Sequence, residues 1–208
     1  MPSIFVTAFE PYDRWTENSS WLTLVEFTKQ VERDAQITTR LYPVDFEAVR
    51  HRLDMDLDAD YDFALHLGQL PGAAGIHLES IAVNVGSDSH GAPGDFDPLV
   101  QDGPVAYRSE LPLGPWAEML RKAGIPTTLS YHAGTLLCNA TMYLAHYHVE
   151  KKGFRTQTTF IHVPLDTGQA AREKKEMPTL PASVCAGALR MIVMELVKLE
   201  QSRDLKPA

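Results

Sequence analysis

The sequence holds one cysteine in a position suited to chemistry, Cys138 in the stretch AGTLLCNATMY. It follows a glycine-containing loop and stands where an apolar-patterned helix should begin. Unpaired backbone N–H groups and the helix dipole favour the thiolate form of a cysteine there, and the thiolate attacks carbonyl carbons. The alternative is a packing role, because free cysteine is among the most buried residue types. Cys185 lies inside the amphipathic run ASVCAGALRMIV, which predicts a core position.

Two further side chains could serve such a nucleophile. His162 lies near the end of the run TTFIHVP, where a strand meets a Pro-containing loop, and a base there could reach the cysteine. His132 also lies late in an expected strand and is a competitor. Glu79 stands in the apolar run HLESIAVN, where a buried carboxylate needs a partner such as an imidazole. An edge position with Glu79 in water is the other interpretation of that pattern.

The elements that must position these residues alternate between strand and helix. Apolar runs predict strands at 3–9, 37–44, 61–69, 75–85 (strand or hairpin), 125–132 and 156–164. Helical periodicity predicts helices at 21–32, 45–57, 114–124, 136–153 and 181–201, the first with an N-cap within Asn18-Ser19-Ser20. This alternation predicts an α/β fold, a single-domain three-layer α/β/α arrangement with a mainly parallel twisted sheet. Sites in such sheets gather at the carboxyl ends of the strands.

Length and composition limit the function classes. The 208 residues predict one domain, 1–208, in which 86–115 is a long surface excursion, because Gly, Pro, Asp and Ser are frequent there. The net charge of -8 and the lack of a basic stripe argue against nucleic acid as a partner. We expect no membrane span and no leader segment, because no apolar run is long enough. With only two cysteines, a reduced, cytoplasmic location fits.

Cofactor motifs are missing from the sequence. It contains no H-E-x-x-H, paired C-x-x-C, Walker-type or G-x-G-x-x-G motif, and its eight histidines are scattered. We therefore expect no metal site and no cofactor.

Five segments, in order, resemble the motifs of the type I pyroglutamyl peptidases, also called pyrrolidone carboxyl peptidases, which are cytosolic cysteine peptidases. They are VTAFEPY, HLGQ, LESIAVN, AGTLLCNATMY and FIHVP, and the match spans nearly the whole chain. The resemblance implies that the chain removes N-terminal pyroglutamate (5-oxoproline) from peptides through a Cys-His-Glu triad on Cys138, His162 and Glu79. It also implies a thioester intermediate and a homodimer or homotetramer.

The resemblance further implies a pocket for the flat lactam ring of pyroglutamate. Phe9 and Tyr12 would hold the ring between their aromatic side chains, and Gln69 would lie beside the lactam. Leu137, next to the nucleophile, belongs to the same expected pocket. The backbones of Gln69 and Cys138 are the candidates for the oxyanion site.

The first loop departs from the family pattern, because Asp13 and Arg14 stand where members commonly have two glycines. Both residues disfavour positive φ, so we expect loop 10–18 to follow a path other than the family's glycine turn and to close over substrate as a lid. Leu136 replaces an aromatic residue, and 86–100 follows the family pattern poorly. Two alternatives to the peptidase therefore stay open: a non-catalytic protein that binds pyroglutamyl peptides, and a cysteine amidase for another small cyclic or acyl amide.

Overall fold

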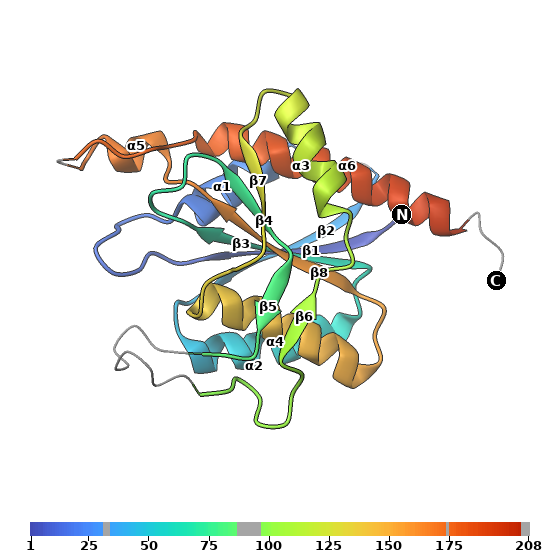
Figure 1. The fold of residues 1–208 in the computed structure, drawn as a ribbon. Helices are drawn as coiled ribbons and strands as arrows, with labels where there is room; N and C mark the ends of the chain where they lie inside the picture. Colours follow the sequence, from blue (N-terminus) through green and yellow to red (C-terminus); the bar gives the residue numbers. More distant parts are fainter. Residues whose placement is uncertain (31–33, 87–96, 174, 205–208) are drawn as a thin grey trace.

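The structure, a computed structural model, describes residues 1–30, 34–86, 97–173 and 175–204. A six-stranded sheet forms its middle layer, with helices on both faces (Figure 1). The strands of this sheet, in spatial order, are β2 (Gln36–Tyr42), β1 (Ser3–Phe9), β3 (Phe63–Gln69), β8 (Gln157–Val163), β4 (Ile76–Glu79) and β7 (Thr127–Ser130). The predicted three-layer α/β/α fold with a mainly parallel sheet is confirmed.

The direction of the strands divides the sheet into two parts. β2, β1, β3 and β8 run parallel to one another, whereas β4 is antiparallel to β8 and parallel to β7. β1, β3 and β8 are almost completely buried because helices cover both faces, which explains their continuous apolar runs. Their carboxyl ends, which deliver Phe9, Gln69 and His162, therefore lie at one edge of the sheet.

Helices cover the two faces of the sheet in two groups (Figure 1). The first group is α1 (Ser19–Thr28), α3 (Leu113–Lys122) and α6 (Ala182–Asp204), and the second is α2 (Phe46–Asp56) with the 3₁₀ turn η1 (Leu57–Ala59) and α4 (Leu137–Lys152). Each group packs over its own hydrophobic cluster, and the predicted core residue Cys185 belongs to the first. None of the described helices combines the length and apolar character that a membrane span needs.

The ends of the helices follow local capping chemistry. The Asn18 side chain accepts a hydrogen bond from the Ser20 N–H at 3.0 Å, which confirms the predicted N-cap of α1. α1 ends at Thr28, earlier than its periodicity predicted. α4 ends at Lys152 and is capped by Gly153, whose φ of 67° is a left-handed conformation that glycine adopts readily. The N-terminus of α4 has no side-chain cap, so its first N–H groups stay available.

The segment 86–115 is only partly an irregular excursion. Residues Ala106–Arg108 form strand β6, which pairs antiparallel with β5 (Ile81–Val83), and α3 begins at Leu113. Residues 87–96 of this segment lie outside the described residues. The predicted strand at 75–85 is divided because Ser80 bonds to two different neighbours: its N–H donates to the Ser130 oxygen at 2.8 Å, and its oxygen accepts from Ser109 at 2.9 Å. β5 thereby leaves the main sheet.

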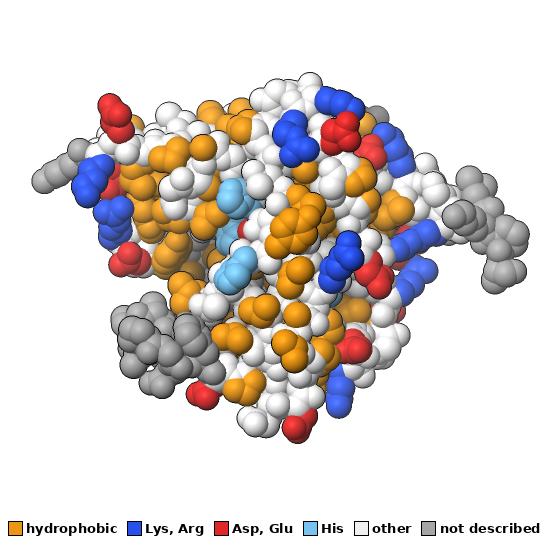
Figure 2. Space-filling model, in the orientation of Figure 1, with side chains coloured by type: hydrophobic (Ala, Val, Ile, Leu, Met, Phe, Trp, Pro, Cys, Tyr) orange, Lys and Arg blue, Asp and Glu red, His pale blue; other side chains and the backbone are white. Residues whose placement is uncertain are grey.

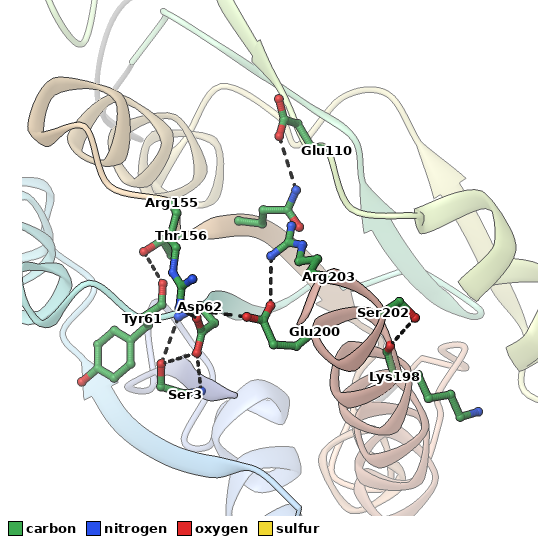
Figure 3. A network of polar contacts seen from close by, with 11 residues as sticks. Ser3, Tyr61, Asp62, Glu110, Arg155, Thr156, Lys198, Glu200, Ser202 and Arg203 are labelled. Carbon is green, nitrogen blue, oxygen red and sulfur yellow. Dashed lines mark hydrogen bonds and ion pairs between the residues drawn. The ribbon is translucent and has the colours of Figure 1, made fainter. Parts of the chain in front are cut away.

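A polar network joins the starts of β1, β3 and β8 to the C-terminal helix (Figure 3). Asp62 accepts hydrogen bonds from both the backbone N–H and the hydroxyl of Ser3, each at 2.8 Å, and from Arg155 at 2.6 Å. Glu200 of α6 lies 4.0 Å from Arg155 and 3.1 Å from Arg203. The network therefore stabilises the sheet at the edge opposite to the carboxyl ends of these strands.

Two histidines, the fully buried His66 and the partly exposed His146, pack between the sheet and α4. His66 on β3 forms a hydrogen bond with Thr7 Oγ1 at 2.8 Å, and His146 on α4 stacks on Tyr107 with ring centroids 5.5 Å apart. Burial lowers the pKa of His66 to about 3, with a further lowering by His146, and lowers the pKa of His146 to about 4. Folding thus favours the neutral forms. The pKa of a histidine in the unfolded chain is about 6.5, so the neutral histidines contribute fully to the free energy of unfolding above about pH 6.5. This contribution is lost as the pH falls from about 6.5 towards 4.

We expect the free energy of unfolding to decrease between pH 7 and pH 5, by at most about 2 kcal/mol for each of the two histidines. The raised pKa of His162, about 9, acts in the opposite direction, but its effect is complete by about pH 6.5 and does not compensate. Urea unfolding at both pH values measures the change. The double variant His66→Gln, His146→Gln is the control and should lose most of this pH dependence; an equal dependence in both proteins would contradict the explanation.

Candidate active site

Side chains from three separate elements meet on the side of the sheet that faces α4. Glu79 on β4 and His162 on β8 are 1% and 4% exposed, and Glu79 Oε1 lies 2.7 Å from His162 Nδ1. Cys138, the second residue of α4, neighbours the same imidazole and raises its pKa. Because Nδ1 faces the carboxylate, Nε2 is the ring nitrogen available to the thiol. The structure therefore brings together the three residues that the sequence singled out.

Glu79 reaches His162 because β4 runs antiparallel to β8. His162 is paired with His77 and Glu79 with Phe160, so Glu79 and His162 are diagonal neighbours on one face of the sheet. The burial of Glu79 excludes the alternative in which this residue faces water at an edge. The competing His132 is exposed in the turn after β7, where its Nδ1 accepts a hydrogen bond from the Gly134 N–H at 2.8 Å.

Asn139 fixes the first turn of α4, next to the thiol. Its side chain is fully buried; Oδ1 accepts a hydrogen bond from the Val83 N–H at 2.9 Å, and Nδ2 donates to the oxygens of Val83 and Val85 at 2.9 and 2.8 Å. These three bonds tie the helix start to β5. Our sequence reasoning missed Asn139, although an amide directly after a candidate nucleophile in an apolar helix is a signal of such a role.

Gly68 leaves room for the thiol. It is paired with His162 between β3 and β8. A Cβ atom at this position would lie 3.2 Å from Cys138 Sγ and 2.5 Å from the Phe160 ring. The second distance is far below van der Waals contact, so a side chain at Gly68 would displace the ring or the sulfur. The close approach of these groups, and not an unusual φ, requires glycine here.

The charges of the site favour a protonated imidazole. Burial alone would lower the pKa of His162, but its contacts with Cys138 and with Glu79 raise the pKa to about 9. A protonated histidine next to a cysteine stabilises the negative thiolate form of that cysteine. Both cysteines of the chain are free of disulfides.

Two of the expected pocket residues pack into the hydrophobic cluster beneath the site. Phe9 is buried at the end of β1, with its ring centroid 6.3 Å from those of Tyr42 and Phe160. Phe160 in turn lies 4.8 Å from the His162 ring. Leu137 is buried in the same cluster. Phe9 and Leu137 thus belong to the hydrophobic cluster on which the His162 side of the site packs.

Tyr12 and Gln69 lie close together near the thiol. Burial raises the pKa of the half-buried Tyr12, the neighbouring Gln69 amide lowers it, and Cys138 raises it further. Gln69 ends β3, and its Oε1 accepts hydrogen bonds from the Ser19 N–H at 2.8 Å and from Gln169 Nε2 at 2.7 Å. Our sequence reasoning missed Gln169. The signal was the spacing D-x-x-Q after β8, which is typical of a capping box, and α5 (Thr167–Ala170) has one.

The expectation that Asp13 avoids positive φ is wrong. This residue has a φ of 52°, so it adopts the left-handed conformation that we expected it to avoid. Asp tolerates this region better than most residues because its short polar side chain can bond locally. The Trp15 N–H closes the turn by donating to the Tyr12 oxygen at 3.0 Å, and Arg14 covers the Trp15 ring, 4.6 Å from its centroid. Closure of the loop as a lid stays a prediction.

Figure 2 shows hydrophobic side chains gathered to the right of the charged groups at the far left, and histidine side chains near the centre of the view. Among the residues that the structure describes, no group of three or more His, Cys, Asp or Glu side chains could hold a metal ion.

The chain matches known proteins over almost its full length. A family model described as pyroglutamyl peptidase matches residues 2–198. The chain belongs to the pyroglutamyl peptidase family. This confirms the resemblance seen in the sequence, and membership of the pyroglutamyl peptidase family makes the chain a peptidase.

Three relatives show how far the similarity to pyroglutamyl peptidases extends. The pyrrolidone-carboxylate peptidase of Clavibacter michiganensis subsp. michiganensis is 34% identical, over 99% of this chain and 97% of its own. That of Pyrococcus furiosus is also 34% identical, over 88% and 89%. The crystal structure of the pyrrolidone carboxyl peptidase from Fervidobacterium islandicum AW-1 superposes with a TM-score of 0.89 at 28% identity, over 95% of this chain and 99% of that one.

Proposed function

We propose that this chain removes pyroglutamate from the N-terminus of peptides, with Cys138 as nucleophile, His162 as acid and base, and Glu79 as the group that orients the imidazole. The observation that carries the proposal is the contact series from Glu79 through His162 to Cys138, which starts in a buried carboxylate and ends at a helix start. A nucleophile, a base and an orienting group in such a series are the parts that acyl transfer requires.

In the first half of the reaction, the Cys138 sulfur attacks the carbonyl carbon that joins pyroglutamate to the next residue, and a C–S bond forms. The carbonyl oxygen becomes negative, and the backbone N–H groups of Cys138 and Gln69 stabilise it. The N–H of Cys138 suits this role because it lies in the first turn of α4, where no intrahelical acceptor exists. His162 then protonates the leaving nitrogen, the C–N bond breaks, and a thioester remains on Cys138.

In the second half, water cleaves the thioester. His162 accepts a proton from the water molecule, whose oxygen attacks the thioester carbon, and the C–S bond breaks. Pyroglutamate leaves, and Cys138 and His162 return to their starting state. Glu79 keeps the proton of His162 on Nδ1 throughout, so Nε2 stays available, and its negative charge offsets that of the imidazolium. No cofactor takes part.

Substrate selection depends on the lactam ring. Phe9 and Tyr12 supply aromatic surface for a flat ring, Leu137 adds apolar surface, and the Gln69 amide supplies a polar contact. An ordinary N-terminal residue carries a charged amine, which this apolar surface would have to desolvate at a cost in free energy. The proposal includes a single peptidase domain that forms a homodimer or homotetramer. It places the protein in the cytoplasm, where free thiols such as those of this chain persist.

The experiment that tests this proposal is the release of a fluorophore from a pyroglutamyl amide. The matched control substrate is the prolyl amide, which has the same ring size without the lactam carbonyl. We expect release only from the pyroglutamyl substrate, and its loss after treatment with iodoacetamide. Binding without release would favour the non-catalytic alternative, and release from other small amides alone would favour an amidase of different specificity.

A further inference from the structure

Gln169 lies beyond the strand that carries His162, and its side chain is 3% exposed. Its Nε2 donates one hydrogen bond to Gln69 Oε1 at 2.7 Å and another to the backbone oxygen of Glu17 at 2.8 Å. Its Oε1 accepts a hydrogen bond from the Asp166 N–H at 2.9 Å. The orientation of this amide is therefore unambiguous, because the backbone N–H of Asp166 can only donate a hydrogen bond and the backbone oxygen of Glu17 can only accept one.

The same contacts fix the amide of Gln69. The Ser19 N–H lies 2.8 Å from Oε1, and because a backbone N–H can only donate, the atom that faces it is the oxygen. Oε1 thus receives two hydrogen bonds, and Nε2 must point away from them. Nε2 is buried and makes no direct hydrogen bond among the described residues, and the Tyr12 hydroxyl is its neighbour. A buried donor without an acceptor costs free energy, so Nε2 gains from a substrate oxygen that reaches it.

The unpartnered donor lies in the same small region as the nucleophile. The backbone of Gln69 directly follows Gly68, the residue that faces Cys138 Sγ, and the Gln69 side chain leaves the strand towards Ser19. The Tyr12 side chain neighbours both Cys138 and the Gln69 amide. Pyroglutamate offers one lactam carbonyl as acceptor and one lactam N–H as donor. With its oxygen already engaged twice, the Gln69 side chain can recognise only the acceptor.

We propose that Gln169 is a positioning residue that holds the Gln69 amide with Nε2 directed at the lactam carbonyl oxygen of the substrate. The inference rests on the proposed function. Gln169 also links this orientation to loop 10–18 through the backbone of Glu17. Without the Gln169 donor, only the Ser19 N–H holds Gln69 Oε1, so the amide rotates more readily and can present its own oxygen to the lactam oxygen, which is repulsive.

The variant Gln169→Glu separates this role from helix capping. A glutamate at this position keeps an oxygen that can accept the Asp166 N–H, as in an ordinary capping box, but it replaces the donor by a second acceptor. We expect KM for the pyroglutamyl amide to rise about tenfold or more, with a much smaller change in kcat. The control Arg172→Met removes an ion pair with the side chain of Glu17 and should change neither constant.

The pH dependence of the variant provides a readout that a purely structural role would not move. The introduced carboxyl group faces two acceptor oxygens, which raises its pKa. Once protonated, it can donate one hydrogen bond to Gln69 Oε1. The ratio of KM in Gln169→Glu to KM in the parent should therefore decrease as the pH is lowered from 8 to 6. If Gln169→Glu does not fold, Gln169→Met, which lacks both donors, should show the higher KM without the pH response.

A double-mutant cycle tests whether Gln169 acts through Gln69. In a Gln69→Met background the effect of Gln169→Glu on KM should shrink to less than about twofold, because the group that it positions is gone. An unchanged KM in folded Gln169→Glu, or an equal effect in the Gln69→Met background, would overturn the inference. The dissociation constant of a pyroglutamyl dipeptide in a Cys138→Ala background gives the same comparison without turnover. If the unsubstituted protein binds this peptide but never cleaves it, the proposed function is contradicted and the inference about Gln169 is not.

Discussion

Replacing Cys138 by alanine should abolish the hydrolysis of pyroglutamyl amides while the fold stays intact. The nucleophile is essential to each half of the reaction, and removal of such a group from comparable hydrolases lowers kcat by about 10⁴-fold to 10⁶-fold. The cost in stability is small by comparison, because Cys138 is only half-buried at a helix start that Asn139 fixes independently. Steady-state kinetics and urea unfolding of the same preparation measure both effects.

Cys185→Ala is the matched control for this prediction. Cys185 is buried in the core of the opposite helical layer, and burial raises its pKa to about 12, so its thiol stays protonated at neutral pH. We therefore expect Cys185→Ala to keep most of its activity and iodoacetamide to label Cys138 in the parent. Loss of activity that accompanies alkylation of Cys185 would show that the nucleophile has been assigned wrongly.

The second large effect is expected from Glu79→Gln, which changes one atom and preserves the shape of the side chain. Glu79 Oε1 accepts the Nδ1 proton of His162 at 2.7 Å. An amide nitrogen at that place would favour the other tautomer, with the proton on Nε2, where the imidazole can no longer act as a base towards Cys138. We expect kcat/KM to fall by about 10²-fold to 10⁴-fold, less than for removal of the nucleophile.

The pH profile of Glu79→Gln provides a second readout. The Glu79 carboxylate helps to raise the pKa of His162 to about 9, so its removal lowers that pKa. Since the protonated imidazole is then lost at lower pH, the alkaline limb of the activity profile should move to lower pH. Glu110→Gln, at an exposed position near the start of β8, serves as the control. Equal activity and an unchanged profile in Glu79→Gln would show that the carboxylate has no orienting role.

The sequence was sufficient to predict the parts of the site that depend on local pattern. The helix start at Cys138 follows from a glycine-containing loop next to an apolar period, and His162 and Gln69 follow from apolar runs that end in loops. Such runs identify strands buried on both faces, and their carboxyl ends are the natural place for a site. The fold class could therefore be predicted from alternation alone.

The remaining features depend on contacts between segments that are distant in the sequence. The antiparallel direction of β4, which brings Glu79 diagonally to His162, cannot be read from its four residues. The division of 75–85 depends on Ser80 bonding to Ser130 and to Ser109. Asp13 was misjudged because a general preference about φ was applied to a residue type that tolerates the left-handed region. Local strand and helix patterns contain no information on such contacts.

The contact between Gln169 and Gln69 is a similar case, since 100 positions separate the two residues. The D-x-x-Q spacing predicts the local capping bond to Asp166, and the structure has it. The other two bonds of the Gln169 amide, to Gln69 and to the backbone of Glu17, exist only because the segment after β8 packs beside the end of β3 and loop 10–18. The polar contacts of the pocket therefore had to come from the structure.

The central claim is that the Cys138 thiol attacks a carbonyl group held in a site that recognises the lactam ring. A pyroglutamyl chloromethyl ketone tests it most directly, because it pairs the lactam with an electrophile that alkylates the nucleophile permanently. Mass spectrometry of the digested protein should find one label per chain, on Cys138, formed more slowly in the presence of excess 5-oxoproline and far more slowly with the prolyl analogue. Labelling of Cys185, or equal rates for the pyroglutamyl and prolyl reagents, would contradict the account.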